Sequence, residues 1–145
     1  MHARMQVLSN ISDRLSDMHS AGYVHRDIKP GNIMFLPRTK RWTLIDFGCA
    51  ARIGSHAGTG FSLFYAAPEV LQAYVNNELG VVATEALDAW SLGLLAIELF
   101  TGKPVFDRTQ PTGDVSILHL ASSLHCIVFT GSECMPVLLV LQSTV

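Results

Sequence analysis

The apolar side chains among the first twenty residues recur at steps of three and four along the chain. They are Met5, Leu8, Ile11, Leu15 and Met18. This spacing places them on one face of an α-helix. We expect the helix to end near Gly22, because glycine readily adopts the left-handed conformation of a helix cap.

Two short apolar runs follow, at residues 33–36 and 42–45, and a basic turn that opens with Pro37 separates them. Short apolar runs around a polar turn are typical of a β-hairpin. The next segment, residues 48–60, is rich in glycine, serine and alanine. This composition predicts a mobile loop.

A second helical segment spans residues 87–100 and is apolar on nearly every face. Such a helix is expected to be buried, and Gly102 and Pro104 are suited to end it. The pattern as a whole therefore predicts a mainly α fold with one small β-hairpin.

The character of the sequence changes after Phe106. Arg108 is the last basic residue, and only Asp114 and Glu133 carry charge beyond it. The remaining positions are mostly Ser, Thr, Leu and Val without a clean period. We expect a boundary here, with one domain at residues 1–106 and a divergent tail of unassigned structure at residues 107–145.

Composition narrows the class of protein. The chain has 145 residues, of which 49% are hydrophobic and 15% charged, as in a globular domain with its own core. A net charge of -2 gives no support for a nucleic-acid partner, and no apolar run approaches the length of a membrane span. The three cysteines are an odd number without a paired framework. That favours free thiols and an intracellular, cytoplasmic location.

The residues that carry chemistry lie in the segments HRDIKPGN, at 25–32, and DFG, at 46–48. Phosphoryl transfer from a nucleotide needs a divalent metal, a group that positions the hydroxyl nucleophile, and positive charge near the migrating phosphoryl group. Magnesium prefers carboxylate and amide oxygens. The residues of these types are Asp27, Lys29, Asn32 and Asp46, and the predicted hairpin would fold Asp46 back towards Asp27.

These segments resemble the catalytic loop and the D-F-G motif of eukaryotic-type protein kinases. Residues 67–69 are similar to the A-P-E motif of that family, and residues 88–93 look like the start of the central helix of its large lobe. The four motifs occur in the family's order and with its ordinary spacing. The resemblance covers roughly residues 1 to 106. It implies the C-terminal, large lobe of a kinase, truncated at both ends.

The resemblance also implies roles. Asp27 resembles the catalytic aspartate, which accepts or orients the proton of the substrate hydroxyl, although an isolated aspartate here would suit a turn or a helix cap. Lys29 resembles the lysine that contacts the transferring phosphate. Asn32 and Asp46 resemble the two positions that bind Mg²⁺ with ATP. Lysine at position 29 favours the serine/threonine class and a protein substrate.

Other motif residues are expected to be structural. His25 and Phe47 resemble members of a stacked apolar spine in the core. Arg26 resembles an arginine that often pairs with a phosphorylated activation loop, and an ordinary surface ion pair is the alternative. Asp88 is expected to bond to the backbone of the catalytic loop, or to be a simple charge at a helix N-terminus.

Three positions of the later motifs remain. Gly48 completes the D-F-G motif, and Ser62 stands where the family often has a threonine that bonds to the catalytic aspartate and lysine. Glu69 normally pairs with an arginine near the end of the large lobe, and no residue after Arg108 can serve. We therefore expect an unpaired buried carboxylate that destabilises the fold.

Two readings of function follow. The small lobe of the family holds a glycine-rich loop, a strand lysine and a helix glutamate, and none occurs here. The first reading is a fragment of a serine/threonine kinase whose full-length parent phosphorylates protein hydroxyls, the isolated chain being inactive. The second is a catalytically inactive, kinase-like interaction module. A truncated gene model and a degenerate paralogue would both produce these departures.

Overall fold

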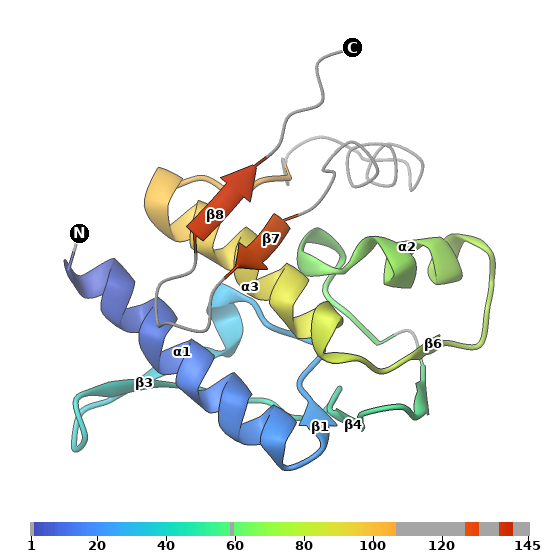
Figure 1. The fold of residues 1–145 in the computed structure, drawn as a ribbon, viewed down its shortest axis with the longest axis horizontal. Coiled ribbons are helices and arrows are strands. Elements are labelled where there is room, and N and C mark those ends of the chain that lie inside the picture. Colours follow the sequence, from blue (N-terminus) through green and yellow to red (C-terminus); the bar gives the residue numbers. More distant parts are fainter. Residues whose placement is uncertain (1, 59, 107–126, 131–136, 141–145) are drawn as a thin grey trace.

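The computed structural model describes residues 2–58, 60–106, 127–130 and 137–140 of the chain. This part of the chain contains three α-helices and four small antiparallel sheets (Figure 1). The helices are α1 (His2–Ser20), α2 (Pro68–Val75) and α3 (Glu85–Thr101). Two short 3-10 helices are also present among the described residues, η1 (Pro30–Asn32) and η2 (Leu63–Tyr65).

Each sheet consists of two strands. The pairs are β1 (Tyr23–Val24) with β4 (Ala51–Arg52), β2 (Ile33–Leu36) with β3 (Arg41–Leu44), β5 (His56–Ala57) with β6 (Val81–Val82), and β7 (Ile127–Thr130) with β8 (Val137–Val140). The predicted hairpin is thus present as β2–β3. Phe35 lies opposite Trp42 in its register, and their rings are 5.2 Å apart.

The predicted first helix is confirmed, because α1 buries its apolar face. Ile11 and Leu15 pack with Leu95 of α3 and Leu44 of β3. Figure 1 shows α1 and α3 side by side, with the β2–β3 hairpin along α1. Gly22 has a φ of 84°, the left-handed conformation expected where this helix ends.

The second predicted helix is α3, which is buried along most of its length. Its buried side chains are Leu87, Asp88, Ser91, Leu94, Leu95 and Ala96. Gly102 caps it in the left-handed conformation, and the Gly102 N–H donates to the carbonyl of Glu98 at 2.8 Å. A helix with so little polar surface is stable only inside a core, as the sequence predicts.

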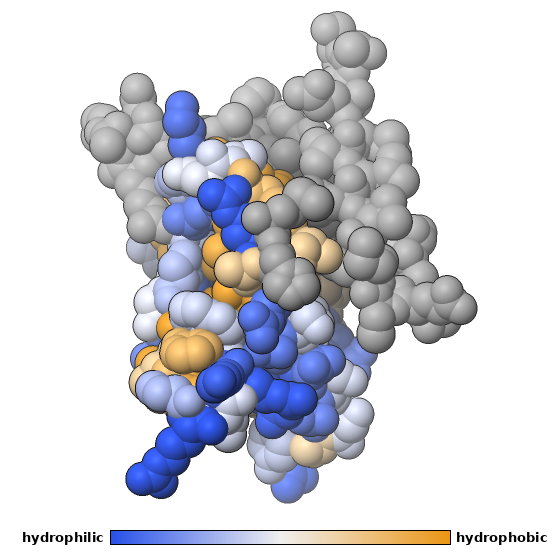
Figure 2. Space-filling view, turned by 90° about the vertical axis from the view of Figure 1, so that its left-hand side faces the viewer, coloured by the Kyte–Doolittle hydropathy of each residue, from blue (hydrophilic) through white to orange (hydrophobic). Residues whose placement is uncertain are grey.

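The turn of the β2–β3 hairpin carries basic side chains and is exposed. Arg38, Lys40 and Arg41 all face solvent. Figure 2 shows the face towards which this turn points, and the lower part of that face is mostly hydrophilic. No helix among the described residues has both the length and the apolarity needed to cross a membrane.

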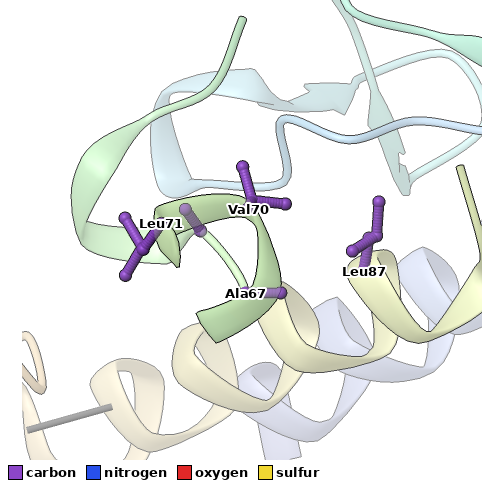
Figure 3. Packing of buried hydrophobic residues seen from close by; sticks show 5 residues of the cluster. Ala67, Val70, Leu71 and Leu87 are labelled. Carbon is purple, nitrogen blue, oxygen red and sulfur yellow. The ribbon is translucent and has the colours of Figure 1, made fainter. Parts of the chain in front are cut away.

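Helix α2 was not predicted. Pro68 occupies its first turn, where the missing N–H of proline costs no hydrogen bond. Ala67, Val70 and Leu71 are buried in one cluster with Leu87 of α3 (Figure 3). This packing stabilises a helix that is too short to show a period in the sequence.

The segment predicted as a loop, residues 48–60, contains the short strands β4 and β5. Their partners are β1 and β6, which lie far away in the sequence, so no local pattern marks them. Thr59 lies outside the described residues. The predicted boundary at residue 107 stays a prediction, because most of the tail also lies outside them.

Candidate active site

A buried carboxylate on α3 holds the segment that resembles a catalytic loop. Asp88 is fully buried. Its Oδ2 accepts the backbone N–H of His25 at 2.8 Å, and its Oδ1 accepts that of Arg26 at 2.7 Å. Arg26 has a φ of 69°, a conformation that costs roughly 1–2 kcal/mol in a residue other than glycine. The expected bonds from Asp88 to the loop backbone are present and stabilise this turn.

Asp27 is the centre of a second network. Its Oδ2 lies 2.6 Å from Nζ of Lys29 and 2.9 Å from Nδ2 of Asn32. Nδ2 of Asn32 also donates to the backbone carbonyl of Asp27 at 2.8 Å. The other carboxylate oxygen, Oδ1, is buried and has no hydrogen-bond partner among the described residues. One oxygen is therefore fixed by two donors, while the other makes no hydrogen bond with the described residues.

Ser62 joins this network from the far end of the loop. Nζ of Lys29 donates to its Oγ at 2.7 Å, so a single ammonium group bridges Asp27 and Ser62. The structure thus brings together Asp27, Lys29, Asn32 and Ser62. The first three are neighbours in the sequence, whereas Ser62 reaches the site only through the folded loop.

The surroundings of Asp27 favour its charged form. Burial raises the pKa of this carboxyl group. The hydrogen bond from Lys29, the nearby hydroxyl group of Ser62, the charge of Lys29 and the hydrogen bond from Asn32 lower it by more, so the pKa lies below the ordinary value. Asp27 is consequently ionised at neutral pH and is able to accept a hydrogen bond from a hydroxyl group.

Asp46 lies next to Asn32 because the hairpin returns the chain to that point. The N–H of Ile45 donates to the carbonyl of Asn32 at 2.9 Å, and Asp46 follows directly. Asp46 has a φ of 62° and an exposed side chain. Its Oδ1 accepts the Gly48 N–H at 3.2 Å. A Cβ on Gly48 would lie 3.2 Å from the same oxygen, so glycine gives the carboxylate the room it needs.

The oxygens of Asn32 and Asp46 fit a magnesium ion better than a softer metal. The amide N–H group of Asn32 is used on Asp27, which leaves its carbonyl oxygen as a ligand, and Asp46 adds a carboxylate. Magnesium commonly takes one or two such protein oxygens and completes its shell with water and phosphate. No cluster of three or more His, Cys, Asp or Glu suited to a metal occurs within the described ranges.

His25 and Phe47, both expected in the core, differ in their exposure to solvent. His25 is fully buried, and its Nε2 lies 3.2 Å from the carbonyl of Ile45. Phe47 packs on the His25 ring at 5.2 Å but is 56% exposed. The prediction that Phe47 belongs to the core is wrong for the described residues, because they cover only one side of its ring.

The prediction for Glu69 is wrong. Glu69 is exposed in the first turn of α2, so there is no buried unpaired carboxylate at this position and no penalty for one.

His19, in the last turn of α1, was not predicted as a site residue. Its Nε2 lies 2.8 Å from Oδ2 of Asp88, and it thereby joins α1 to the support of the catalytic loop. Only its place at the end of a helix hints at this role.

Arg26 points into the loop that follows the D-F-G motif. It donates from NH1 to the carbonyl of Cys49 at 3.1 Å and from NH2 to the carbonyl of Gly58. Among the described residues Arg26 makes no ion pair, so the alternative of an ordinary surface ion pair is not met there. The pairing of Arg26 with a phosphorylated loop stays a prediction.

Comparison with known proteins decides the family. The family described as protein kinase domain matches residues 2–131 of the chain. This chain belongs to the protein kinase family. The chain is 35% identical over 105 residues to homeodomain-interacting protein kinase 2 of Mus musculus, a match that covers 69% of this chain and 8% of that protein. It is 38% identical over 112 residues to a probable serine/threonine-protein kinase of Bifidobacterium longum, a match that covers 74% of this chain and 14% of that protein.

Among solved structures, the chain resembles the Cydia pomonella granulovirus kinase PK-1 with a TM-score of 0.67 and 21% sequence identity. That match covers 81% of this chain and 42% of the viral chain, and at this identity it bears on the fold alone. The chain therefore spans less than half of the viral kinase chain and a small part of its sequence relatives. The recognition of a eukaryotic-type protein kinase from the four motifs is confirmed.

Proposed function

We propose that this chain supplies the catalytic centre of a protein serine/threonine kinase, which transfers the γ-phosphate of ATP to a hydroxyl group of a protein substrate. The observation that carries the proposal is the state of Asp27. One carboxylate oxygen is fixed by Lys29 and Asn32, and the other has no partner among the described residues. A held, ionised carboxylate with one oxygen that is free of hydrogen bonds to the described residues is suited to orient a hydroxyl nucleophile and accept its proton.

Lys29 is proposed to contact the transferring phosphate. Its ammonium group already lies 2.6 Å from Asp27, so it would place positive charge beside the reacting oxygen. In phosphoryl transfer, catalysis consists almost entirely of positioning and electrostatic stabilisation. A cation beside the acceptor oxygen supplies both, and Ser62 fixes where that cation lies.

Asn32 and Asp46 are proposed to hold Mg²⁺ through the amide oxygen and the carboxylate. When bound, the metal would neutralise charge on the nucleotide phosphates. Asp46 keeps an exposed side chain at the end of β3, where an incoming phosphate can reach the same ion. The Gly48 N–H donates to Oδ1 of this carboxylate at 3.2 Å and so helps to orient it.

Residues 1–106 are proposed to form the large lobe of the kinase, and residues 107–145 a divergent tail. The buried helix α3, the catalytic loop on Asp88 and the β2–β3 hairpin support this assignment. The serine/threonine class is supported by Lys29 and by the serine/threonine kinase among the relatives. The 145-residue chain alone is proposed to be inactive, because its sequence shows no glycine-rich loop, strand lysine or helix glutamate.

The test is transfer of radiolabelled phosphate from ATP by the longest natural product of the gene that contains these residues. We expect labelling of serine and threonine peptides, no labelling of a matched tyrosine peptide, and complete loss when a chelator removes Mg²⁺. The 145-residue chain serves as the control without transfer. Absence of transfer by the longer product would favour the interaction-module alternative.

A further inference from the structure

Large apolar side chains lie exposed where α2 ends and the chain passes through β6 to α3. They are Tyr74, Val75, Leu79 and Val82. The N–H of Glu78 donates to the carbonyl of Ala73 at 2.8 Å, so the connection from α2 to β6 folds back on the end of the helix. Leu79 follows directly and is fully exposed. Apolar side chains that gather on a surface commonly mark a contact with another molecule.

The charged side chains of this region are negative. Residues 74–85, which we call the acidic corner, include Glu78 and Glu85 and contain no lysine or arginine. Both glutamates are exposed, and neither makes an ion pair with a described residue. The guanidinium group of Arg52, on the nearby strand β4, lies over the ring of Tyr23 instead. The acidic corner is therefore suited to a cationic partner that also offers apolar surface.

The turn of the β2–β3 hairpin carries the opposite charge. Its cationic side chains are all exposed, and they are Arg38, Lys40 and Arg41. None of them makes an ion pair with a described residue, and no acidic residue occurs between Asp27 and Asp46 in the sequence. We call residues 37–41 the basic turn. Phe35, two residues before it, adds an exposed aromatic ring.

The basic turn and the acidic corner lie at opposite ends of the described fold. Figure 1 shows the turn of β2–β3 on the left and the connection from α2 to β6 on the right. The two surfaces therefore do not meet within one copy of the chain. Opposite charges on separate surfaces of one protein attract copies of that protein to one another, and the contact then joins two different patches.

We propose that the basic turn of one copy of this chain binds the acidic corner of a second copy. The cations of the turn face Glu78 and Glu85, and Leu79 is the apolar anchor of the contact. Exposed ion pairs contribute little each, so the association is weak and reversible. A polyanion is a poorer occupant for the turn, because the net charge of the whole chain is -2. This association goes beyond the proposed function and is measured without activity.

The test is sedimentation velocity of the 145-residue chain over a concentration series at low salt. We expect the mean sedimentation coefficient to rise with concentration and to fall again on dilution. The rise should be mostly lost in about 0.5 M NaCl, where the Debye length is about 4 Å.

Substitutions in the two surfaces should weaken the association. Glu78→Lys and Lys40→Glu should each raise the dissociation constant about three- to tenfold, and Leu79→Gln should raise it about tenfold. Asp13→Lys and Lys103→Glu are the matched controls, because they make the same charge changes at exposed positions outside both surfaces. Neither control should change the dissociation constant.

The double variant Glu78→Lys with Lys40→Glu is the decisive one. It keeps the net charge of the wild type and reverses both sides of the contact. Its dissociation constant should therefore return to within about threefold of the wild-type value. If circular dichroism shows that Glu78→Lys unfolds the chain, Glu85→Lys replaces it in both variants.

The proposal is overturned if the chain sediments as a monomer at every concentration, or if salt leaves its association unchanged. A double variant that associates no better than the single variants also overturns it. A monomer that binds heparin or anionic vesicles through the basic turn would assign the turn to a polyanion instead. Association that Phe47→Gln abolishes and Leu79→Gln leaves intact would place the contact beside Phe47, against the proposal.

Discussion

At the scale of single residues, local spacing predicts contacts between neighbours in the chain, and the family motifs predict two distant ones, from Asp88 to the catalytic-loop backbone and from Lys29 to Ser62. Asp27, Lys29 and Asn32 lie within one short segment, and their hydrogen bonds follow from that spacing. The contacts of His19 with Asp88 and of Arg26 with Gly58 join distant segments. They depend on how α1, α3 and the loop pack, which no local pattern specifies.

The pKa of Asp27 should rise in the variant Lys29→Met. Burial remains, whereas the strongest hydrogen bond and the neighbouring charge are lost. The pKa should therefore reach or exceed the ordinary value of about 3.9. Carbon-13 chemical shifts of the carboxyl group across a pH titration measure it. Lys40→Met, at the exposed turn, is the control, and an unchanged pKa in Lys29→Met would show that Lys29 does not act on Asp27.

The ion pair of Asp27 with Lys29 makes the free energy of unfolding depend on pH. Because the pKa of Asp27 is lower in the folded chain than in the unfolded chain, its contribution to the free energy of unfolding is complete above about pH 5. The contribution is lost as the pH falls through the folded-state pKa. Wild type and Lys29→Met should thus differ by about 1 kcal/mol near pH 7 and by less near pH 2 in urea unfolding.

Asp88→Ala should destabilise the fold strongly. It leaves the buried N–H groups of His25 and Arg26 without an acceptor, at a cost of about 1–3 kcal/mol for each group. Glu85→Ala, an exposed acid in the first turn of the same helix, should change the free energy of unfolding by less than about 0.5 kcal/mol. Equal effects of both substitutions in urea unfolding would contradict the role given to Asp88.

At the scale of elements, length decided what the sequence could predict. Helices α1 and α3 and the β2–β3 hairpin are long enough for their apolar spacing to show. Helix α2 and strands β1, β4, β5 and β6 have two to eight residues and are stabilised by partners distant in the chain. These elements form because of tertiary packing, which local sequence does not show. The sequence of residues 48–60 therefore predicted a loop where β4 and β5 are found.

Gly80 tests the pairing of β5 with β6. A Cβ at this position would lie 2.1 Å from the carbonyl oxygen of Ala57, and its φ is +157°. Gly80→Ala should therefore separate the two strands and lower the free energy of unfolding by about 1–3 kcal/mol. Gly58→Ala enters open space and should be nearly neutral. Comparable melting temperatures of the two variants would exclude this close approach.

At the scale of the whole molecule, the described fold has a partly apolar face beside Phe47. A cavity of about 340 Å³ on this face is lined by Met18, Tyr23, Leu44 and Phe47, together with the polar side chains of Arg14, Asp17 and Thr43. Phe47 and Tyr23 are 56% and 38% exposed. Apolar surface of this kind commonly marks an interaction site. The sequence motifs predicted a core position for Phe47 and a buried carboxylate for Glu69, whereas both side chains are exposed in the described part of the chain.

This face should bind a hydrophobic dye. Phe47→Gln removes the large side chain at the edge of the cavity and should lower the fluorescence of the bound dye by roughly half. Leu79→Gln is the matched control, because Leu79 is fully exposed and does not line the cavity. A decrease of equal size in both variants would mean that the dye binds elsewhere.

The central claim is that Asp27 orients the hydroxyl group that receives the phosphate. Its most direct test is the rate of phosphate transfer to a serine peptide by the longest natural product that contains this chain. Asp27→Asn keeps the shape of the side chain and should lower the rate by about 10²–10⁴-fold, while Asp13→Asn, exposed on α1, should leave it unchanged. A rate that survives Asp27→Asn would contradict the account.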